Sequence, residues 1–252
     1  MSGGQLVGFW RGFSSLFAGL RSLLGAPGAW PFALVPVVIF FLLEAGFVTF
    51  SWLVVKPWVD EAVTSAGWLE WLGEWQQTTA GLAAWVSLVL TAVLGWLVSA
   101  FFVPPLSSPA LERLVAMTEA ELGAPQRAPL GVLAELWCGV RSSLMATAIT
   151  LPLIFGLWLL ALLVPPAAIV ATPLKLLLGA LGIAWSLFDY PMTLRGIGVR
   201  QRLSFVKRHA APVLGFGVAF ALVFWLPCCG VLLLPVGVIA ATRLFWEIER
   251  AR

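Results

Sequence analysis

Long apolar stretches alternate with shorter polar segments along the chain, and this alternation predicts a membrane protein with several helices. Residues 31–55 and 80–102 form two apolar runs, each longer than the roughly 20 residues that a helix needs to cross the hydrocarbon core of a bilayer. The first run is interrupted only by Glu44, and the second ends at Pro104 and Pro105. We therefore expect two long transmembrane helices here.

Two further apolar stretches, residues 148–190 and 211–246, are broken by prolines at residues 164–166 and 226–230. Each arm of the second stretch has about 16 residues, or about 24 Å as a helix, whereas the hydrocarbon core is roughly 30 Å thick. This length favours a hairpin that enters and leaves the membrane on the same side. The arms of the first stretch are longer, so six crossings and two crossings with two re-entrant hairpins both remain open.

The remaining segments are more polar or amphipathic. Residues 1–28 combine a helix whose apolar side chains recur at helical spacing with a Pro-Gly turn, and such a helix lies in the membrane interface. Residues 106–147 predict cytoplasmic or interfacial helices, and residues 193–209 form a short basic segment. We expect all of these parts to belong to one polytopic membrane domain, residues 1–252.

Composition narrows the class of protein further. The chain is 61% apolar and 11% charged, whereas a soluble domain carries about 25% charge. The net charge of +3 is spread between apolar segments, which argues against nucleic acid as a partner and for membrane lipids. Three cysteines and a single histidine predict no disulfide framework and no metal site, and HExxH, GxSxG and phosphate-loop motifs are absent from the sequence. We expect neither an enzyme nor a cofactor.

Basic residues predict how the chain is oriented. If both termini, residues 106–147 and residues 193–209 share one side, and Arg243 near the end of the last arm is counted with the C-terminal tail, that side holds every Lys and Arg except Lys56 and Lys175. Loops rich in Lys and Arg face the cytoplasm. We therefore expect cytoplasmic N- and C-termini.

Two charges fall inside apolar stretches. Glu44 lies 13 residues after Pro31, or about 20 Å along a helix, so it is well inside the membrane. Intramembrane charges are costly and often functional. We consider a contact between Glu44 and Lys175, or a proton-coupling role of the carboxylate, against a glutamate that only faces the bundle interior.

The segment Ala184-Trp185-Ser186-Leu187-Phe188-Asp189-Tyr190-Pro191 precedes the basic segment and the last proline-broken hairpin. In this position Asp189, Tyr190 and Pro191 resemble the CysZ sulfate-permease family, whose domain is shared with the eukaryotic etoposide-induced membrane proteins. The order of segments is similar over nearly the whole chain. The resemblance implies an all-α integral membrane protein with two long transmembrane helices, two partly penetrating helical hairpins and amphipathic interfacial helices. It also implies a homo-oligomer of the bacterial inner membrane that takes up sulfate for cysteine synthesis.

The resemblance also indicates a site for the anion. In the sulfate permeases, a basic pair follows a Pro-Gly turn before the first long helix. Here Pro27 and Gly28 are followed by Ala29, Trp30 and Pro31, so the basic pair is missing. The free N–H groups at the start of a helix can hold an anion, which makes Pro27, Gly28 and Trp30 the candidate sulfate-binding residues. The alternative is a plain helix start with an interfacial tryptophan.

The charged residues around the family motif have two interpretations. A carboxylate such as Asp189 near a helix C-terminus is unfavourable and should pair with a cation that fixes the turn, and Arg195 and Arg200 are the nearest in sequence. The alternative is a direct role of Asp189 in transport. The basic segment, with Arg195, Arg200 and Arg202, either sets topology and binds anionic lipid or forms an electropositive vestibule for an anion.

The leading hypothesis is thus a permease or channel for sulfate or a similar small inorganic anion. The alternative is a non-transporting membrane scaffold with the same fold, because the basic pair of the family is missing.

Overall fold

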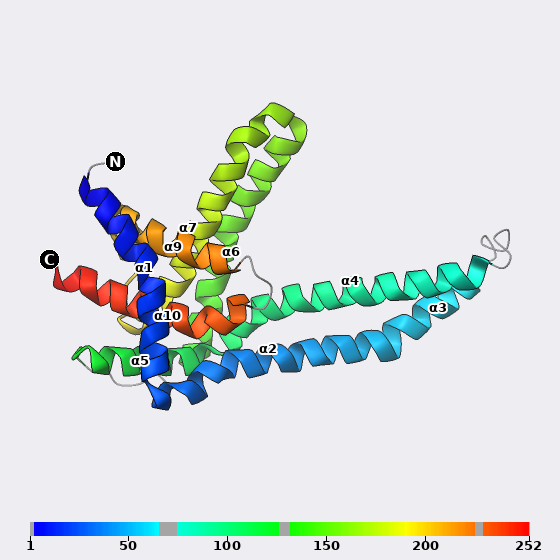
Figure 1. The fold of residues 1–252 in the computed structure, drawn as a ribbon, viewed down its shortest axis with the longest axis horizontal. Coiled ribbons are helices and arrows are strands. Elements are labelled where there is room, and N and C mark those ends of the chain that lie inside the picture. Colours follow the sequence, from blue (N-terminus) through cyan, green and yellow to red (C-terminus); the bar gives the residue numbers. More distant parts are fainter. Residues whose placement is uncertain (1–2, 66–74, 126–131, 225–228, 252) are drawn as a thin grey trace. The chain divides into compact units, whose positions relative to one another are not determined.

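The computed structural model describes residues 3–65, 75–125, 132–224 and 229–251, and every regular element in these ranges is a helix (Figure 1). Short turns of other helix types lie at Pro27–Ala29, Ser51–Val55 and Pro165–Ala167. The α-helices are α1 (Gly3–Gly25), α2 (Trp30–Phe50), α3 (Lys56–Thr64), α4 (Trp75–Leu106), α5 (Ser108–Glu121), α6 (Val132–Leu163), α7 (Ala168–Leu194), α8 (Val199–Arg208), α9 (Ala210–Phe224) and α10 (Cys229–Arg250).

Within the described residues, four helical segments are long and apolar enough to cross a membrane. They are Pro27–Thr64, Thr78–Leu106, Ala168–Leu194 and Gly230–Arg250. The expectation of an all-α membrane protein is therefore confirmed. The chain forms two compact units, which we describe separately. Val37–Pro104 is called the hairpin unit below, and Met1–Pro36 with Pro105–Arg252 is called the bundle unit.

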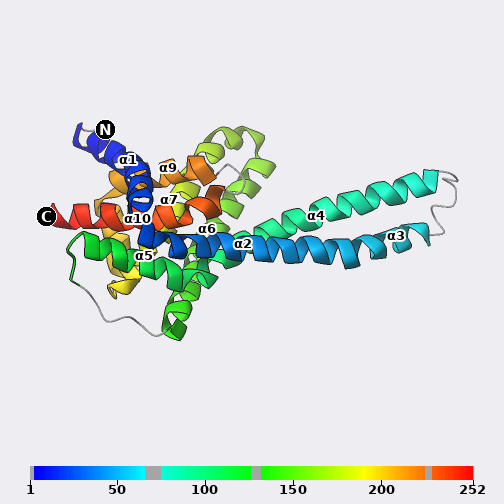
Figure 2. The same cartoon turned by 60° about the horizontal axis from the view of Figure 1, so that its bottom comes forward.

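In the hairpin unit, α2 and α3 run side by side with α4 (Figures 1 and 2). The helix predicted over residues 31–55 continues to Thr64. A π-helical turn at Ser51–Val55 joins α2 to α3, and the N–H of Lys56 donates to the carbonyl of Ser51. Pro57 has no N–H to donate to the preceding turn, so a widened turn lets the helix pass this proline without ending.

Small residues on α4 allow the two long helices to approach closely. A Cβ atom at Gly95 would lie 2.7 Å from the Cβ atom of Phe47 on α2, so a larger residue there would push the two helices apart. The hydroxyls of Ser87 and Thr91 donate to carbonyls of their own helix at 2.8 and 2.7 Å, which removes two polar groups from the apolar surface. Most large apolar side chains of this unit remain exposed, as expected for a surface that faces lipid.

In the bundle unit, α1 packs chiefly along α9 through glycines. A methyl group at Gly12 would overlap the carbonyl oxygen of Pro212, and one at Gly215 would overlap the carbonyl oxygen of Phe9. Glycine therefore brings the two backbones into direct contact, as in membrane helix pairs with small residues at the interface. The amphipathic helix expected at the N-terminus is present, and one of its faces is buried against other helices; its depth in the membrane remains a prediction.

Aromatic rings fill the centre of the bundle unit. Phe216 on α9 lies 5.0 Å from Phe188 on α7 and 4.7 Å from Phe220, measured between ring centroids. The ring centroids of Phe205 on α8 and Phe245 on α10 are 5.2 Å apart. This core lies beside the ends of α7 and α10, where Asp189, Arg243, Glu247, Glu249 and Arg250 are placed.

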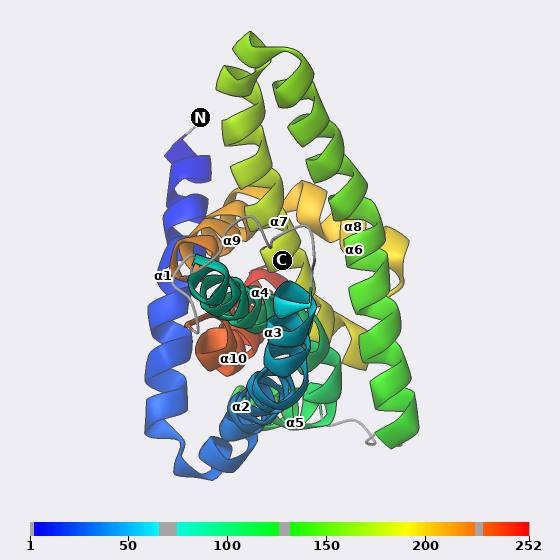
Figure 3. The same cartoon turned by 90° about the vertical axis from the view of Figure 1, so that its right-hand side faces the viewer.

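The first predicted hairpin is formed by α6 and α7, which lie side by side and join at Pro165–Ala167 (Figures 1 and 3). The proline break lies where we expected it. The first arm begins as early as Val132 and has 32 residues, so it includes part of the segment expected to be cytoplasmic or interfacial, residues 106–147.

The second hairpin has unequal arms. α9 has 15 residues and follows α8 at a bend of 94°. α10 has 22 residues and is longer than expected, because the helix continues past Trp246 through charged residues to Arg250. The expectation of a short arm is therefore confirmed for α9 and wrong for α10. Residues 225–228, which include most of the apex, lie outside the described residues.

Candidate anion-binding site

The Pro-Gly turn after α1 offers few backbone donors. Pro27 and Pro31 have no N–H. The N–H of Ala29 donates to the carbonyl of Ala26 at 2.9 Å, and the N–H of Trp30 donates to the carbonyl of Pro27. Of the predicted binding residues Pro27, Gly28 and Trp30, only Gly28 therefore has an N–H that is not bonded within this turn. An anion at this place requires charged side chains from elsewhere.

A cavity of about 640 Å³ adjoins this turn and supplies them. Its walls come from the end of α1, the turn itself, the second half of α5 and the middle of α10. The floor is apolar, with Leu114, Met117 and Ile239. The polar residues at its wall are Arg21, Ser22, Thr118, Glu121 and Arg243.

Two arginines give the cavity its charge. Arg243 donates from Nη2 to Oε1 of Glu121 at 2.9 Å, while its Nε is buried without a hydrogen-bond partner among the described residues. The other carboxylate oxygen of Glu121 accepts a bond of 3.5 Å from the hydroxyl of Ser22. Arg21 is exposed and has no ion pair within the described part of the chain. Two guanidinium groups and one carboxylate leave the cavity positively charged.

This arrangement suits a small oxyanion. A guanidinium group presents several N–H donors in a planar fork that matches tetrahedral and carboxylate oxygens. From the sequence, neither arginine was singled out as a binding residue: Arg21 lies in the predicted interfacial helix, and Arg243 lies near the end of the second proline-broken stretch. The sequence held one indication that Arg21 lies near the Pro-Gly turn, because Arg21 precedes Gly25, where α1 ends, by one helical turn. Nothing in the sequence placed Arg243 near it.

Asp189 pairs with Arg202, so the prediction that its partner is Arg195 or Arg200 is wrong. Thr193 donates to the Asp189 carboxylate at 3.3 Å, and Arg202 donates to the Thr193 hydroxyl at 3.0 Å. The reason lies in the turn after α7. Gly196 has a φ of 64°, a left-handed conformation that glycine adopts easily, and the chain reverses there so that α8 returns beside the end of α7.

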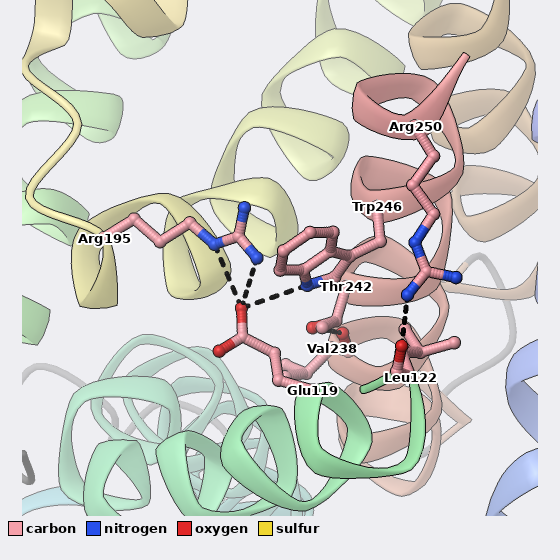
Figure 4. Close-up of polar contacts among 7 residues, drawn as sticks. All are labelled: Glu119, Leu122, Arg195, Val238, Thr242, Trp246 and Arg250. Atoms are coloured by element: carbon pink, nitrogen blue, oxygen red, sulfur yellow. Dashed lines mark hydrogen bonds and ion pairs between the residues drawn. The ribbon is translucent and has the colours of Figure 1, made fainter. Parts of the chain in front are cut away.

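Arg195 forms a second ion pair. Its Nε and Nη2 donate to Oε1 of Glu119 at 3.0 and 2.9 Å (Figure 4). Its guanidinium carbon lies 3.7 Å from the ring centroid of Trp246. The Nε1 of Trp246 donates to the same carboxylate oxygen at 3.3 Å. Arg250 completes the group by donating to the carbonyl of Leu122. These contacts connect α5, the end of α7 and α10. We call the group of Glu119, Leu122, Arg195, Trp246 and Arg250 the clasp, and its role is structural.

The rest of the family motif lies in the helix. We expected the arm to end at Tyr190, but α7 continues through Tyr190 and Pro191 to Leu194. Pro191 is buried and Tyr190 is half-buried. Arg200, at the exposed start of α8, is the one basic-segment residue of our prediction that points to solvent. The vestibule and lipid interpretations of this segment both stay predictions.

The intramembrane charges lie in different units, Glu44 in the hairpin unit and Lys175 in the bundle unit. The predicted contact between them therefore stays a prediction. Lys175 is half-buried and makes no ion pair with the described residues. Oε1 of Glu44 and Oγ of Ser99, on the facing helix α4, are both buried, and neither has a hydrogen bond of normal geometry to another described residue. Within the described residues, no group of three or more His, Cys, Asp or Glu side chains is placed to hold a metal ion.

The fold and the cavity define a polytopic α-helical membrane protein with an arginine-lined cavity at the start of its first long helix. Comparison with known proteins assigns it to a family. The family model described as Sulfate transporter CysZ/Etoposide-induced protein 2.4 matches residues 15–235. The chain belongs to this family, and the resemblance seen in the sequence is confirmed.

Individual relatives are similar over almost their full length. A protein of Pseudomonas syringae pv. tomato named Sulfate transporter CysZ is 30% identical over 239 residues, which cover 92% of this chain and 90% of the relative. The protein of the same name from Pseudomonas aeruginosa is 26% identical over 232 residues, with 91% and 93% covered. That from Pectobacterium atrosepticum is 25% identical over 244 residues, with 96% and 86% covered.

Proposed function

We propose that this protein is a sulfate permease or channel of the bacterial inner membrane that supplies sulfate for cysteine synthesis. The observation that carries the proposal is the cavity lined by Arg21 and Arg243 beside the Pro27–Ala29 turn. These arginines stand in for the basic pair that the resemblance led us to expect after Gly28. Relatives named Sulfate transporter CysZ support transport over the scaffold alternative.

In this proposal the anion binds between the two guanidinium groups, close to the Pro27–Ala29 turn and the start of α2. The positive end of the α2 dipole adds a favourable interaction with a negative ligand there. The side chains of Leu114 and Ile239, which also line the cavity, are apolar and offer the anion no hydrogen-bond partner, so the arginines are its main donors. Sulfate and selenate, which share size and charge, are expected to bind alike.

The proposed orientation places both termini in the cytoplasm and the apices of the two hairpins inside the membrane. The distribution of Lys and Arg supports it. A hairpin that only partly penetrates cannot seal a pathway by itself, and we therefore propose that the protein works as a homo-oligomer. Labelling tests the depth of the second hairpin. In a Cys138→Ser variant, an impermeant thiol reagent added from the periplasm should leave Cys228 and Cys229 unmodified. Rapid modification would contradict partial penetration.

Sulfate flux tests the function. Purified protein is reconstituted into vesicles, and uptake of radiolabelled sulfate is measured with selenate and phosphate as competitors. We expect saturable uptake that selenate inhibits. Uptake equal to that of empty vesicles would contradict the proposed function and favour the scaffold alternative.

A further inference from the structure

Two Arg–Glu pairs lie close together on α5 but differ in geometry. In the pair of Arg195 and Glu119, two nitrogens donate to the carboxylate, and both side chains are only 13% exposed. In the pair of Arg243 and Glu121, one nitrogen donates, and the side chain of Glu121 is 53% exposed. Exposed single-bond pairs contribute little to stability, whereas buried pairs with several bonds are costly to break. The Arg243–Glu121 pair is therefore the one that can open.

The position of Glu121 makes its carboxylate easier to displace. Glu121 is the last residue of α5, where the partial negative charge of the helix end repels an acidic side chain. Its remaining contact is a long hydrogen bond from Ser22. Arg243 Nε, by contrast, is buried with its hydrogen unused in the described structure. An oxyanion with several acceptor atoms can bond to both nitrogens of Arg243, which Glu121 does not do.

We propose that Glu121 is an internal competitor of the transported anion. Its carboxylate occupies Arg243 while the cavity is empty, swings away when a free oxyanion binds between Arg21 and Arg243, and returns to Arg243 to release the anion. This inference rests on the proposed function and adds a release step to it. A tethered carboxylate acts at an effective concentration of about millimolar, so it weakens binding without preventing it. Transport needs this balance, because a site that binds too tightly does not release its ion.

The test separates affinity from turnover. A Glu121→Gln variant removes the competing charge, and we expect its half-saturating sulfate concentration to fall about two- to fivefold, the range expected for an exposed ion pair. Its maximal flux in vesicles should fall as well, because release slows. Arg243→Gln should raise the half-saturating concentration instead.

Glu247→Gln is the matched control. Glu247 on α10 forms a single-bond pair with Arg11 on α1, and its side chain is about as exposed as that of Glu121. Neither Glu247 nor Arg11 lines the cavity. This variant should leave affinity and flux unchanged. An unchanged or weaker affinity in Glu121→Gln would overturn the inference, and so would a higher affinity with unchanged maximal flux.

Two further outcomes distinguish a failure of this inference from a failure of the proposed function. If the wild-type protein takes up sulfate but Glu121→Gln behaves like the wild type, the inference fails and the proposed function stands. If the wild type shows no saturable sulfate binding, the proposed function itself fails. Binding is measured in zwitterionic lipid and again with phosphatidylglycerol added. Loss of sulfate binding with the anionic lipid would assign the cavity to a lipid phosphate group and would overturn the role of Glu121 in release.

Discussion

The hairpin unit and the bundle unit solve the problem of packing apolar helices in different ways. In the hairpin unit, α2 and α4 meet along one line at residues such as Gly95, and most of their large apolar side chains stay exposed to lipid. In the bundle unit, glycines bring backbones into contact, aromatic rings fill the centre, and ion pairs connect the helix ends. Lipid is as apolar as leucine, so close packing and polar contacts, rather than burial from water, hold membrane helices together. The unit with more of these contacts also carries the arginine-lined cavity.

The largest predicted effect concerns the contact of α1 with α9. Gly12→Ala should prevent folding, because a methyl group would overlap the carbonyl of Pro212 and neither backbone can move without breaking the core. Gly4→Ala is the control, since nothing lies near its added methyl group. The yield of monodisperse protein in detergent measures the effect. Equal yields of the two variants would contradict close backbone packing as the basis of the bundle unit.

An intermediate effect is expected at the clasp. Arg195→Gln should lower the free energy of unfolding by about 3 kcal/mol, because it leaves Glu119 partly buried without its charged partner. The exposed pair of Arg11 and Glu247 is the control, and its loss should cost about 0.5 kcal/mol or less. Thermal unfolding in detergent, followed by circular dichroism, compares them. Similar losses in both variants would mean that the clasp is not a special feature of the bundle unit.

The smallest effect is expected in the hairpin unit. Gly95→Ala should lower stability by about 1–2 kcal/mol, because its methyl group would meet Phe47 but the two helices have lipid-exposed faces and can separate slightly. Gly81→Ala lies on the same helix with open space around it and should be neutral or slightly stabilising. The same unfolding measurement applies. A loss at Gly95 as large as that at Gly12 would remove the distinction between the two units.

Features that depend on local sequence were predictable. The apolar runs at residues 31–55 and 80–102 have the length of membrane helices, and proline pairs end or break helices wherever they stand, as at Pro165 and Pro166. The π turn at Ser51–Val55 was not expected, because other helices of the chain pass a proline without one, such as α2 at Pro36 and α10 at Pro235. The length of α10 was also underestimated, because a charged helix end that packs against a core stays helical.

Features that depend on distant contacts were not predictable. Proximity in sequence predicted Arg195 or Arg200 as the partner of Asp189, but the reversal at Gly196 brings Arg202 instead. Arg21 and Arg243 come from opposite ends of the chain, and only the packing of α1 on α10 brings them to one cavity. The basic pair is missing after Gly28, and we propose that Arg21 and Arg243, which lie on other helices, take its place.

Binding of radiolabelled sulfate to the purified full-length protein, compared with an Arg21→Gln/Arg243→Gln double variant, tests the central claim most directly. Arg11→Gln, on the same helix as Arg21 but away from the cavity, is the matched control. We expect saturable binding by the wild type and by the control, and we expect loss of that binding in the folded double variant. Equal binding by all three proteins would contradict anion binding by Arg21 and Arg243.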